Sequence, residues 1–327
     1  MTAAFETEAL WVLEPGRAAI CPQRVRQPGA AEVRVRTRYT AVSRGSEALV
    51  HGGHVPVNQY EAMRAPFQEG DFPGPVKYGY ISVGDVVAGP DGWVGTTVFC
   101  LHPHQREYVV PATAVVPLPG DVPAERAVLA ANMETAVNAL WDGGPLVGER
   151  IAVIGAGLVG CLVARLATAI PGTAVTLVDP QTSRQSVARE LGVAFATPDE
   201  LAGEFDRIFH ASASEAGLRQ ALSVAAFEAV IVELSWFGDR AIALPLGEAF
   251  HSRRLTLRSS QVGGVPAGQR PRWDHGRRLA LAVALLNDPA LDSLITGESD
   301  FPALPQVLAE LSRGPGATLC HRIRYSD

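Results

Sequence analysis

Three glycines spaced for nucleotide binding stand in the segment Ile-Ala-Val-Ile-Gly155-Ala-Gly157-Leu-Val-Gly160. The motif alone is weak evidence, but here an apolar strand pattern precedes it and an apolar helical pattern follows. Gly155 then permits a tight turn, Gly157 lets the backbone approach a diphosphate, and Gly160 lets the helix pack on the strand. The backbone N–H groups of Leu158 and Val159 at the helix start add phosphate donors. A purely structural turn is the alternative.

Asp179 ends the next predicted strand, about 20 residues past the glycines, as the motif requires. A carboxylate there accepts hydrogen bonds from the ribose hydroxyls of NAD and repels the 2′-phosphate of NADP. Arg184, a little further on, can instead reach such a phosphate. The pattern favours NAD and leaves NADP as the alternative.

Histidines in the first third of the chain offer proton transfer or metal binding. His51 titrates near neutrality and can relay a proton, although an exposed loop histidine is the plain alternative. A strand would put His102 and His104 on one face. The intervening Pro103 and the lack of a nearby third ligand argue against a metal. Lining a substrate cleft and a structural role both stay open for this pair.

The elements that must position these side chains fall into two parts. Glu32–Val42 alternates apolar and arginine side chains, and dense Gly and Pro bound short β-type runs between residues 45 and 120. After Pro123, strands and helices alternate, which implies a parallel sheet with right-handed crossovers. The expected strands are 151–154, 174–178, 208–212, 230–234 and 255–260, and the expected helices are 124–140, 158–170, 183–191, 215–225 and 270–286.

Composition excludes several classes of protein. With 327 residues, 47% hydrophobic and 19% charged, the chain is neither disordered nor of low complexity. Its net charge of −6 argues against nucleic-acid binding and against anionic membranes. The apolar run 151–170 is better explained by a strand, a turn and a buried helix than by a membrane span. The N-terminus has no signal-peptide pattern and the four cysteines lack a C-x-x-C pair, so we expect a cytoplasmic protein.

A Rossmann unit placed after a β-rich domain, with a returning C-terminal segment, resembles the medium-chain dehydrogenase/reductase superfamily. The resemblance covers nearly the whole chain and is supported by the blocks Ser43-Arg-Gly-Ser46-Glu47, Tyr78–Val86, Glu134–Leu140 and Ser293–Thr296. It implies an α/β protein with a GroES-like β-rich catalytic domain over residues 1–122 and 266–327. A Rossmann domain with a doubly wound parallel sheet would cover residues 123–265. In this family the substrate lies in the cleft between the two domains, beside the nicotinamide.

Departures from the family pattern indicate a zinc-independent enzyme. Zinc-dependent members carry a cysteine, a histidine and a third Cys or acid at positions that fall here on Arg44, Tyr80 and Ala131. Catalytic zinc needs about three N, S or O ligands, and the lobe with four closely spaced cysteines is missing too. Locally, Ser43-x-Gly-Ser-Glu47 and the Gly-Tyr pair look most like the zinc-free branch that contains bacteriochlorophyllide hydroxyethyl dehydrogenase.

Without zinc, hydrogen-bond donors must stabilise charge on the substrate oxygen. By the family match, Ser46 is the hydroxyl that contacts this oxygen, with a turn-capping serine as the alternative. Tyr80 replaces the zinc-binding histidine and can donate from its phenol, or it simply fills the vacated space. Glu47 matches an acid whose role in relatives is commonly structural.

On the Rossmann side, the resemblance places Ser212, Ser235 and Ser260 after successive strands, beside the cofactor. An arginine-rich stretch near residues 253–278 can attract an anionic substrate, or can be a solvated helix face or a partner contact. We therefore expect an NAD-preferring oxidoreductase acting on an alcohol or carbonyl. An enone or quinone reductase, and a non-catalytic NAD(P)(H)-binding redox sensor, remain alternatives. Oligomers are common among relatives, through an edge strand of the cofactor domain, so a homodimer is one expectation for this chain.

Overall fold

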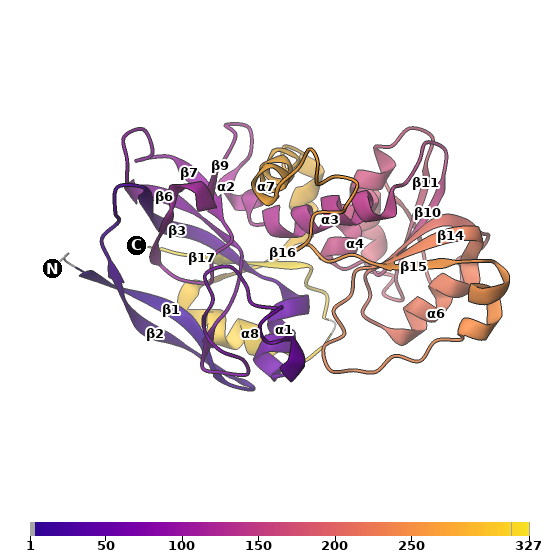
Figure 1. Ribbon diagram of the computed structural model, residues 1–327, viewed down its shortest axis with the longest axis horizontal. Coiled ribbons are helices and arrows are strands. Elements are labelled where there is room, and N and C mark those ends of the chain that lie inside the picture. Colours follow the sequence, from indigo (N-terminus) through magenta and orange to yellow (C-terminus); the bar gives the residue numbers. More distant parts are fainter. Residues whose placement is uncertain (1–3, 315, 327) are drawn as a thin grey trace. The chain divides into compact units, whose positions relative to one another are not determined.

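The computed structural model describes residues 4–314 and 316–326, and the chain forms two compact units (Figure 1). One unit comprises the residues up to 131, 279–289 and those from 295 on; the other comprises 132–278 and 290–294. The chain therefore changes unit at 131/132 and 278/279, later than the expected boundaries at 122/123 and 265/266. No sequence pattern indicated that 290–294 would join the second unit.

The first unit is built on two sheets. Strands of the smaller sheet are β1 (Ala4–Glu14), β2 (Arg17–Arg26), β4 (Glu69–Gly70) and β5 (Val76–Lys77), in the order β2-β1-β5-β4. The larger sheet contains β3 (Glu32–Val42), β6 (Ser82–Ala88), β7 (Thr97–Cys100), β8 (Glu107–Pro111), β9 (Val115–Pro117), β16 (Ile295–Asp300) and β17 (Cys320–Arg324). Its order is β16-β17-β3-β6-β7-β9, with β8 also paired to β3. Helices α1 (Arg44–Gly52), α2 (Ala124–Ala127) and α8 (Leu304–Ser312) belong to this unit, and α8 packs against α1.

Strand β3 leads directly into α1, which carries the catalytic candidates. Val33 and Val35 are fully buried while Arg36 is exposed, which confirms the predicted period of two. The alternation ends where the pairing with β6 shifts register between Thr37 and Tyr39. A bulge of this kind bends a strand, and the last residues of β3 are buried on both faces before the chain enters α1.

The second unit is a Rossmann fold. Its strands are β10 (Arg150–Ile154), β11 (Ala174–Val178), β12 (Ala194–Ala196), β13 (Phe205–His210), β14 (Ala225–Glu233) and β15 (Thr256–Ser259). They form a parallel sheet in the order β12-β11-β10-β13-β14-β15, so the order reverses beside β10. Its helices include α3 (Ala130–Gly143), α4 (Leu158–Thr168), α5 (Arg184–Glu190), α6 (Glu215–Val224) and the first part of α7 (His275–Ala284). This confirms the predicted fold class.

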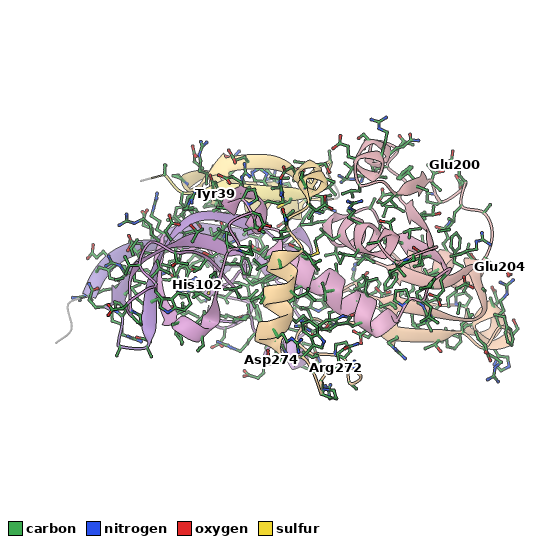
Figure 2. All side chains as sticks on the ribbon, turned by 90° about the horizontal axis from the view of Figure 1, so that it is seen from above. Tyr39, His102, Glu200, Glu204, Arg272 and Asp274 are labelled. Carbon is green, nitrogen blue, oxygen red and sulfur yellow. The ribbon has the colours of Figure 1, made fainter. Side chains whose placement is uncertain are left out.

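Two predicted helices were wrong in extent. The helix expected over 124–140 is two helices, α2 and α3, interrupted at Val128 and Leu129. The helix expected over 270–286 begins only at His275, so Arg272 and Asp274, labelled in Figure 2, precede it. The Asp274 carboxylate accepts the Arg277 N–H at 2.7 Å, as an N-cap does.

The apolar run 151–170 forms β10, the glycine turn and α4, as predicted. No helix in the described part of the chain has both the length and the apolar composition of a membrane-spanning segment.

Candidate functional site

The glycine turn between β10 and α4 has the shape of a diphosphate cradle. Gly155 adopts a φ of +109°, and a Cβ there would lie 2.7 Å from the backbone nitrogen of Ser212. A Cβ on Gly160 would lie 1.9 Å from the carbonyl oxygen of Gly155, so helix and turn touch directly. Gly157 faces open space, with no heavy atom within 4 Å of its Cβ position. The N-cap of α4 is Gly157, which has no side chain to cap the first N–H groups of the helix, among them those of Leu158 and Val159.

Asp179 stands at the end of β11 next to this turn. Its carboxylate accepts the Ala156 N–H at 2.9 Å through one oxygen and the Gln181 N–H at 2.9 Å through the other. Each oxygen keeps lone-pair capacity for a ribose hydroxyl. Arg184 is only 6% exposed, and its positive charge acts on the buried thiol of Cys161. The Arg184 side chain is therefore buried within the unit. The sequence had allowed it to reach the 2′-phosphate of NADP, and this contact stays a prediction.

A shallow hollow of about 870 Å³ lies along α5 and β12. Hydroxyl groups of Thr182, Ser183 and Ser186 line it together with the guanidinium of Arg189. Such a lining suits a phosphate, which accepts hydrogen bonds and carries negative charge.

The polar side chains after β13 and β14 form one network. Ser212 Oγ lies 2.6 Å from Nε2 of His210, whose Nδ1 lies 2.6 Å from a carboxylate oxygen of Glu233. Ser235 Oγ accepts the Ala213 N–H at 3.0 Å. The structure thus joins Ser212 and Ser235 through one network, while their place beside the cofactor stays a prediction. Sequence reasoning missed His210 and Glu233, although a polar residue closing an apolar parallel strand was a usable signal.

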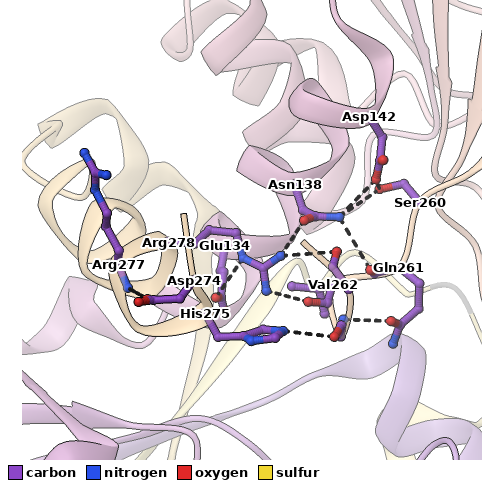
Figure 3. Close-up of polar contacts among 12 residues, drawn as sticks. Glu134, Asn138, Asp142, Ser260, Gln261, Val262, Asp274, His275, Arg277 and Arg278 are labelled. Atoms are coloured by element: carbon purple, nitrogen blue, oxygen red, sulfur yellow. Dashed lines mark hydrogen bonds and ion pairs between the residues drawn. The ribbon is translucent and has the colours of Figure 1, made fainter. Parts of the chain in front are cut away.

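Ser260 is held by side chains of α3. Its hydroxyl donates to the Asp142 carboxylate at 2.7 Å and lies 3.4 Å from the amide nitrogen of Asn138. Asn138 in turn accepts from Arg278, which also pairs with Glu134 at 3.0 Å (Figure 3). Burial raises the pKa of the Glu134 carboxyl and the Arg278 charge opposes that effect. The network holds the loop after β15 in place, and the Ser260 hydroxyl makes its hydrogen bonds within this network.

In the β-rich unit, the two catalytic candidates are in contact. The Tyr80 hydroxyl lies 3.1 Å from Ser46 Oγ and also donates to Ser43 Oγ. Burial raises the pKa of Tyr80, while its hydrogen bonds to the two serines lower it. The phenol is therefore a neutral donor at physiological pH. Ser43, which the sequence offered only as part of a motif, is a third hydroxyl of this group.

Glu47 and His104 form a buried pair behind that hydroxyl group. One Glu47 oxygen accepts the Ser43 N–H at 2.8 Å, and the other lies 2.9 Å from His104 Nε2. His104 Nδ1 bonds Thr40 Oγ1 at 2.7 Å. His51 is buried, with only 5% of its surface exposed, so it is not the exposed loop histidine that the sequence offered as an alternative. Burial lowers the pKa of His51, and its Nε2 has no hydrogen-bond partner among the described residues.

His102 and His104 are both buried, at 4% and 1% exposed. His102 stacks on Tyr108 with ring centroids 3.7 Å apart, and burial lowers its pKa to about 3. Within residues 4–314 and 316–326, no group of three or more His, Cys, Asp or Glu side chains is arranged to hold a metal ion. At the positions matched to zinc ligands stand Arg44, Tyr80 and Ala131, whose side chains do not fit Zn²⁺.

The arginines of residues 253–278 do not form one cationic surface. Arg253 pairs with Glu204, Arg254 pairs with Glu228, and Arg278 is buried in the network around Glu134. Three of the seven arginines in this stretch are therefore paired with a carboxylate of the same unit.

Comparisons with known proteins agree with this architecture. No protein-family model matches the chain. Over 136 residues it is 30% identical to the NADP-dependent alcohol dehydrogenases C 1 and C 2 of Mycolicibacterium smegmatis; the match covers 39% of this chain and 38% of each relative, well under two thirds of their length.

Solved structures match over nearly the full length. L-idonate 5-dehydrogenase from Escherichia coli has a TM-score of 0.80 at 16% identity, covering 98% of this chain and 99% of that one. A short chain alcohol dehydrogenase from E. coli, complexed with NADH, has a TM-score of 0.75 at 17% identity, with coverages of 98% and 99%. The chain therefore has the fold of the medium-chain dehydrogenases/reductases, with a GroES-like β-rich unit and a Rossmann unit.

Proposed function

We propose that the protein is an NAD(P)(H)-dependent oxidoreductase of the medium-chain type, which interconverts an alcohol and a carbonyl without zinc. The observation that carries the proposal is the open cradle at Gly157, flanked by uncapped helix N–H groups and the Asp179 carboxylate. When bound, the nicotinamide ring supplies the position that donates or accepts hydride. Gly155 and Gly160 keep the turn tight, and Asp179 orients the adenosine ribose.

We assign polarisation of the substrate oxygen to Tyr80 and Ser46. In the reducing direction the Tyr80 O–H, which in the free protein donates to Ser43, turns to the carbonyl oxygen and stabilises the negative charge that develops there. It yields its proton to that oxygen as the alcohol forms. The phenolate then regains a proton from Ser46, 3.1 Å away, and Ser46 is reprotonated from solvent water. Zinc independence is supported by the side chains at the three positions matched to zinc ligands. We propose His51 as a proton relay, a role that burial opposes because it disfavours the charged imidazole.

For the cofactor we propose NAD, because the Asp179 carboxylate repels a 2′-phosphate. The hollow lined by Thr182, Ser183, Ser186 and Arg189 supports NADP as a second candidate. The named activity of the M. smegmatis relatives also points to NADP.

Further proposals concern substrate, assembly and compartment. The substrate is a small molecule, anionic if the exposed arginines near residues 258–277 attract it. A homodimer would pair the edge strand β15, whose residues are all exposed. All four cysteines are free thiols, which supports a reducing compartment such as the cytoplasm. An enone or quinone reductase and a non-catalytic nucleotide sensor remain the competing functions.

Fluorescence titration with NADH and NADPH, then a panel of alcohols, aldehydes and enones with metal analysis, tests the proposal. We expect micromolar cofactor binding and turnover of an alcohol or aldehyde without stoichiometric metal. Turnover that requires stoichiometric zinc would refute zinc independence. Cofactor binding without turnover on any substrate would favour the sensor, and reduction of enones alone would favour the reductase.

A further inference from the structure

A buried histidine–glutamate pair lies at the carboxyl edge of the Rossmann sheet. His210 ends β13 and Glu233 ends β14, and the two residues face each other in the strand register. The His210 side chain is 0% exposed and that of Glu233 is 14% exposed. Both histidine nitrogens have partners, because Nδ1 meets Glu233 and Nε2 meets Ser212.

Hydrogen-bond accounting fixes the direction of this network. Glu233 accepts the Ser235 N–H at 2.7 Å through its other oxygen, so as a carboxylate it accepts from two N–H groups. His210 then carries a proton on Nδ1, and its Nε2 accepts the Ser212 O–H. Ser212 Oγ is in turn bonded to Ser214, which caps α6 by accepting the Gly217 N–H at 3.0 Å.

The same network holds a strained turn. Ala213 has a φ of 51°, a conformation that costs energy for a residue with a Cβ. Its N–H donates to Ser235 Oγ, and its carbonyl oxygen accepts from Arg240 at 3.0 Å. Strain of this kind persists where surrounding contacts enforce it, which is typical of ligand sites.

This turn lies directly on the diphosphate cradle. A Cβ on Gly155 would approach the Ser212 nitrogen at 2.7 Å and the Ala211 carbonyl carbon at 2.8 Å, and the Ala211 N–H donates to the Ile154 oxygen. β13 stands on the opposite side of β10 from β11, which carries Asp179. A dinucleotide bound where the strand order reverses therefore places one half near Asp179 and the other near the turn after β13.

The arrangement Ser212–His210–Glu233 also has the connectivity of a hydrolase triad. Its packing argues against a nucleophile. A Cβ on Gly217 would lie 2.5 Å from Ser212 Oγ and 2.9 Å from His210 Nε2, so the first turn of α6 covers the hydroxyl. The Ser212 hydroxyl is also already bonded to His210 and to Ser214, which favours a structural role over that of a nucleophile.

We propose that His210 and Glu233 are positioning residues of the nucleotide site, which hold the turn 211–214 and Ser235 in the form that receives the nicotinamide half. The inference rests on the proposed function, because it requires a dinucleotide to bind at the cradle. The pair acts through the turn and through the two serines rather than by touching the cofactor.

The test compares dissociation constants for NADH and for 5′-AMP, which reports on the adenosine half alone. For His210→Phe and Glu233→Gln we expect the NADH constant to rise about tenfold, equivalent to about 1.4 kcal/mol, while that for 5′-AMP stays within about twofold. Ser212→Ala leaves no buried charge unpaired, so it replaces the first two variants if they fold poorly. It should also weaken NADH binding selectively. Glu233→Asp keeps the carboxylate and should recover part of the affinity.

Glu149→Gln is the matched control. It breaks a similarly buried ion pair with Arg207 at the amino end of the same sheet, with side chains 14% and 12% exposed. We expect it to lower the melting temperature without changing the ratio of the two constants. Equal loss of NADH and 5′-AMP in the His210 and Glu233 variants, or no loss of either, would overturn the positioning role. A wild-type protein that binds neither nucleotide would instead refute the proposed function itself.

Discussion

The hydroxyl of Tyr80 lies 3.1 Å from Ser46 Oγ, although the two residues are 34 positions apart in sequence. Ser46 lies in α1 and Tyr80 precedes β6, so their contact depends on the β-rich unit being folded. Behind them, Glu47 ties the Ser43 backbone to His104. A buried carboxylate thus supports the segment that carries these hydroxyls.

Removing either hydroxyl should impair chemistry more than cofactor binding. We expect Tyr80→Phe and Ser46→Ala each to lower kcat about 100-fold, because each removes a donor that stabilises charge on the substrate oxygen. The double variant should lose much less than the product of the two, because the hydroxyls act as one unit. Steady-state kinetics with the best substrate of the panel, beside NADH titration, measures this. Undiminished turnover in Tyr80→Phe would contradict the assignment.

Alanine substitutions at Gly157 and at Gly160 should distinguish an effect on NADH affinity from an effect on the free energy of unfolding. Gly160→Ala places a Cβ against the Gly155 carbonyl, and overpacking of this kind costs about 1–3 kcal/mol of unfolding free energy. Gly157→Ala meets no atom of the protein, so its loss should appear as a rise of at least about tenfold in the NADH dissociation constant. Urea denaturation and NADH titration of both variants provide the check. The cradle would be misassigned if Gly157→Ala bound NADH normally.

Cofactor preference should shift when the charge near the ribose is removed. Asp179→Asn keeps the size of the side chain but not the repulsion of a 2′-phosphate, so NADPH should gain and NADH should lose affinity. We expect their ratio to change about tenfold, or about 1.4 kcal/mol. Arg189→Ala serves as the companion variant, and it should weaken NADPH alone if the hollow beside α5 holds the phosphate. If the ratio of NADPH to NADH affinity were unchanged in both variants, neither residue would determine the cofactor preference.

Sequence reasoning succeeded where the determinants are local. The glycine turn and Asp179 could be predicted because a tight turn, a close helix contact and a strand end each follow from short-range spacing. His210 and Glu233 could not be paired in advance, because their contact arises from the register between β13 and β14. Domain boundaries were shifted for a related reason, since a helical pattern does not reveal which unit a helix such as α3 or α7 packs against.

Acid should destabilise the β-rich unit through His102. Burial lowers the pKa of His102 to about 3, below its usual value of about 6.5. The unfolded chain therefore binds a proton that the folded chain refuses, so stability is full above about pH 6.5 and falls as the pH drops toward about 3. His102→Phe keeps the stack on Tyr108 without titrating, and its urea midpoint should decline less between pH 7 and pH 5. An identical decline in both proteins would rule out this histidine as a source of acid sensitivity.

Removing one partner of the buried Arg278–Glu134 ion pair should strongly lower the free energy of unfolding. Arg278→Met leaves the Glu134 carboxylate without its counter-charge, in surroundings that already raise its pKa, and removes the donor to the Val262 carbonyl. Such a change typically costs about 3–5 kcal/mol of unfolding free energy. Arg278→Met combined with Glu134→Leu should regain part of that loss, because no unpaired charge then remains inside. Arg219→Ala, which breaks an exposed pair with Glu215, is the control and should cost no more than about 1 kcal/mol in urea denaturation. If the double variant were less stable than Arg278→Met alone, the stranded carboxylate would not be the cause.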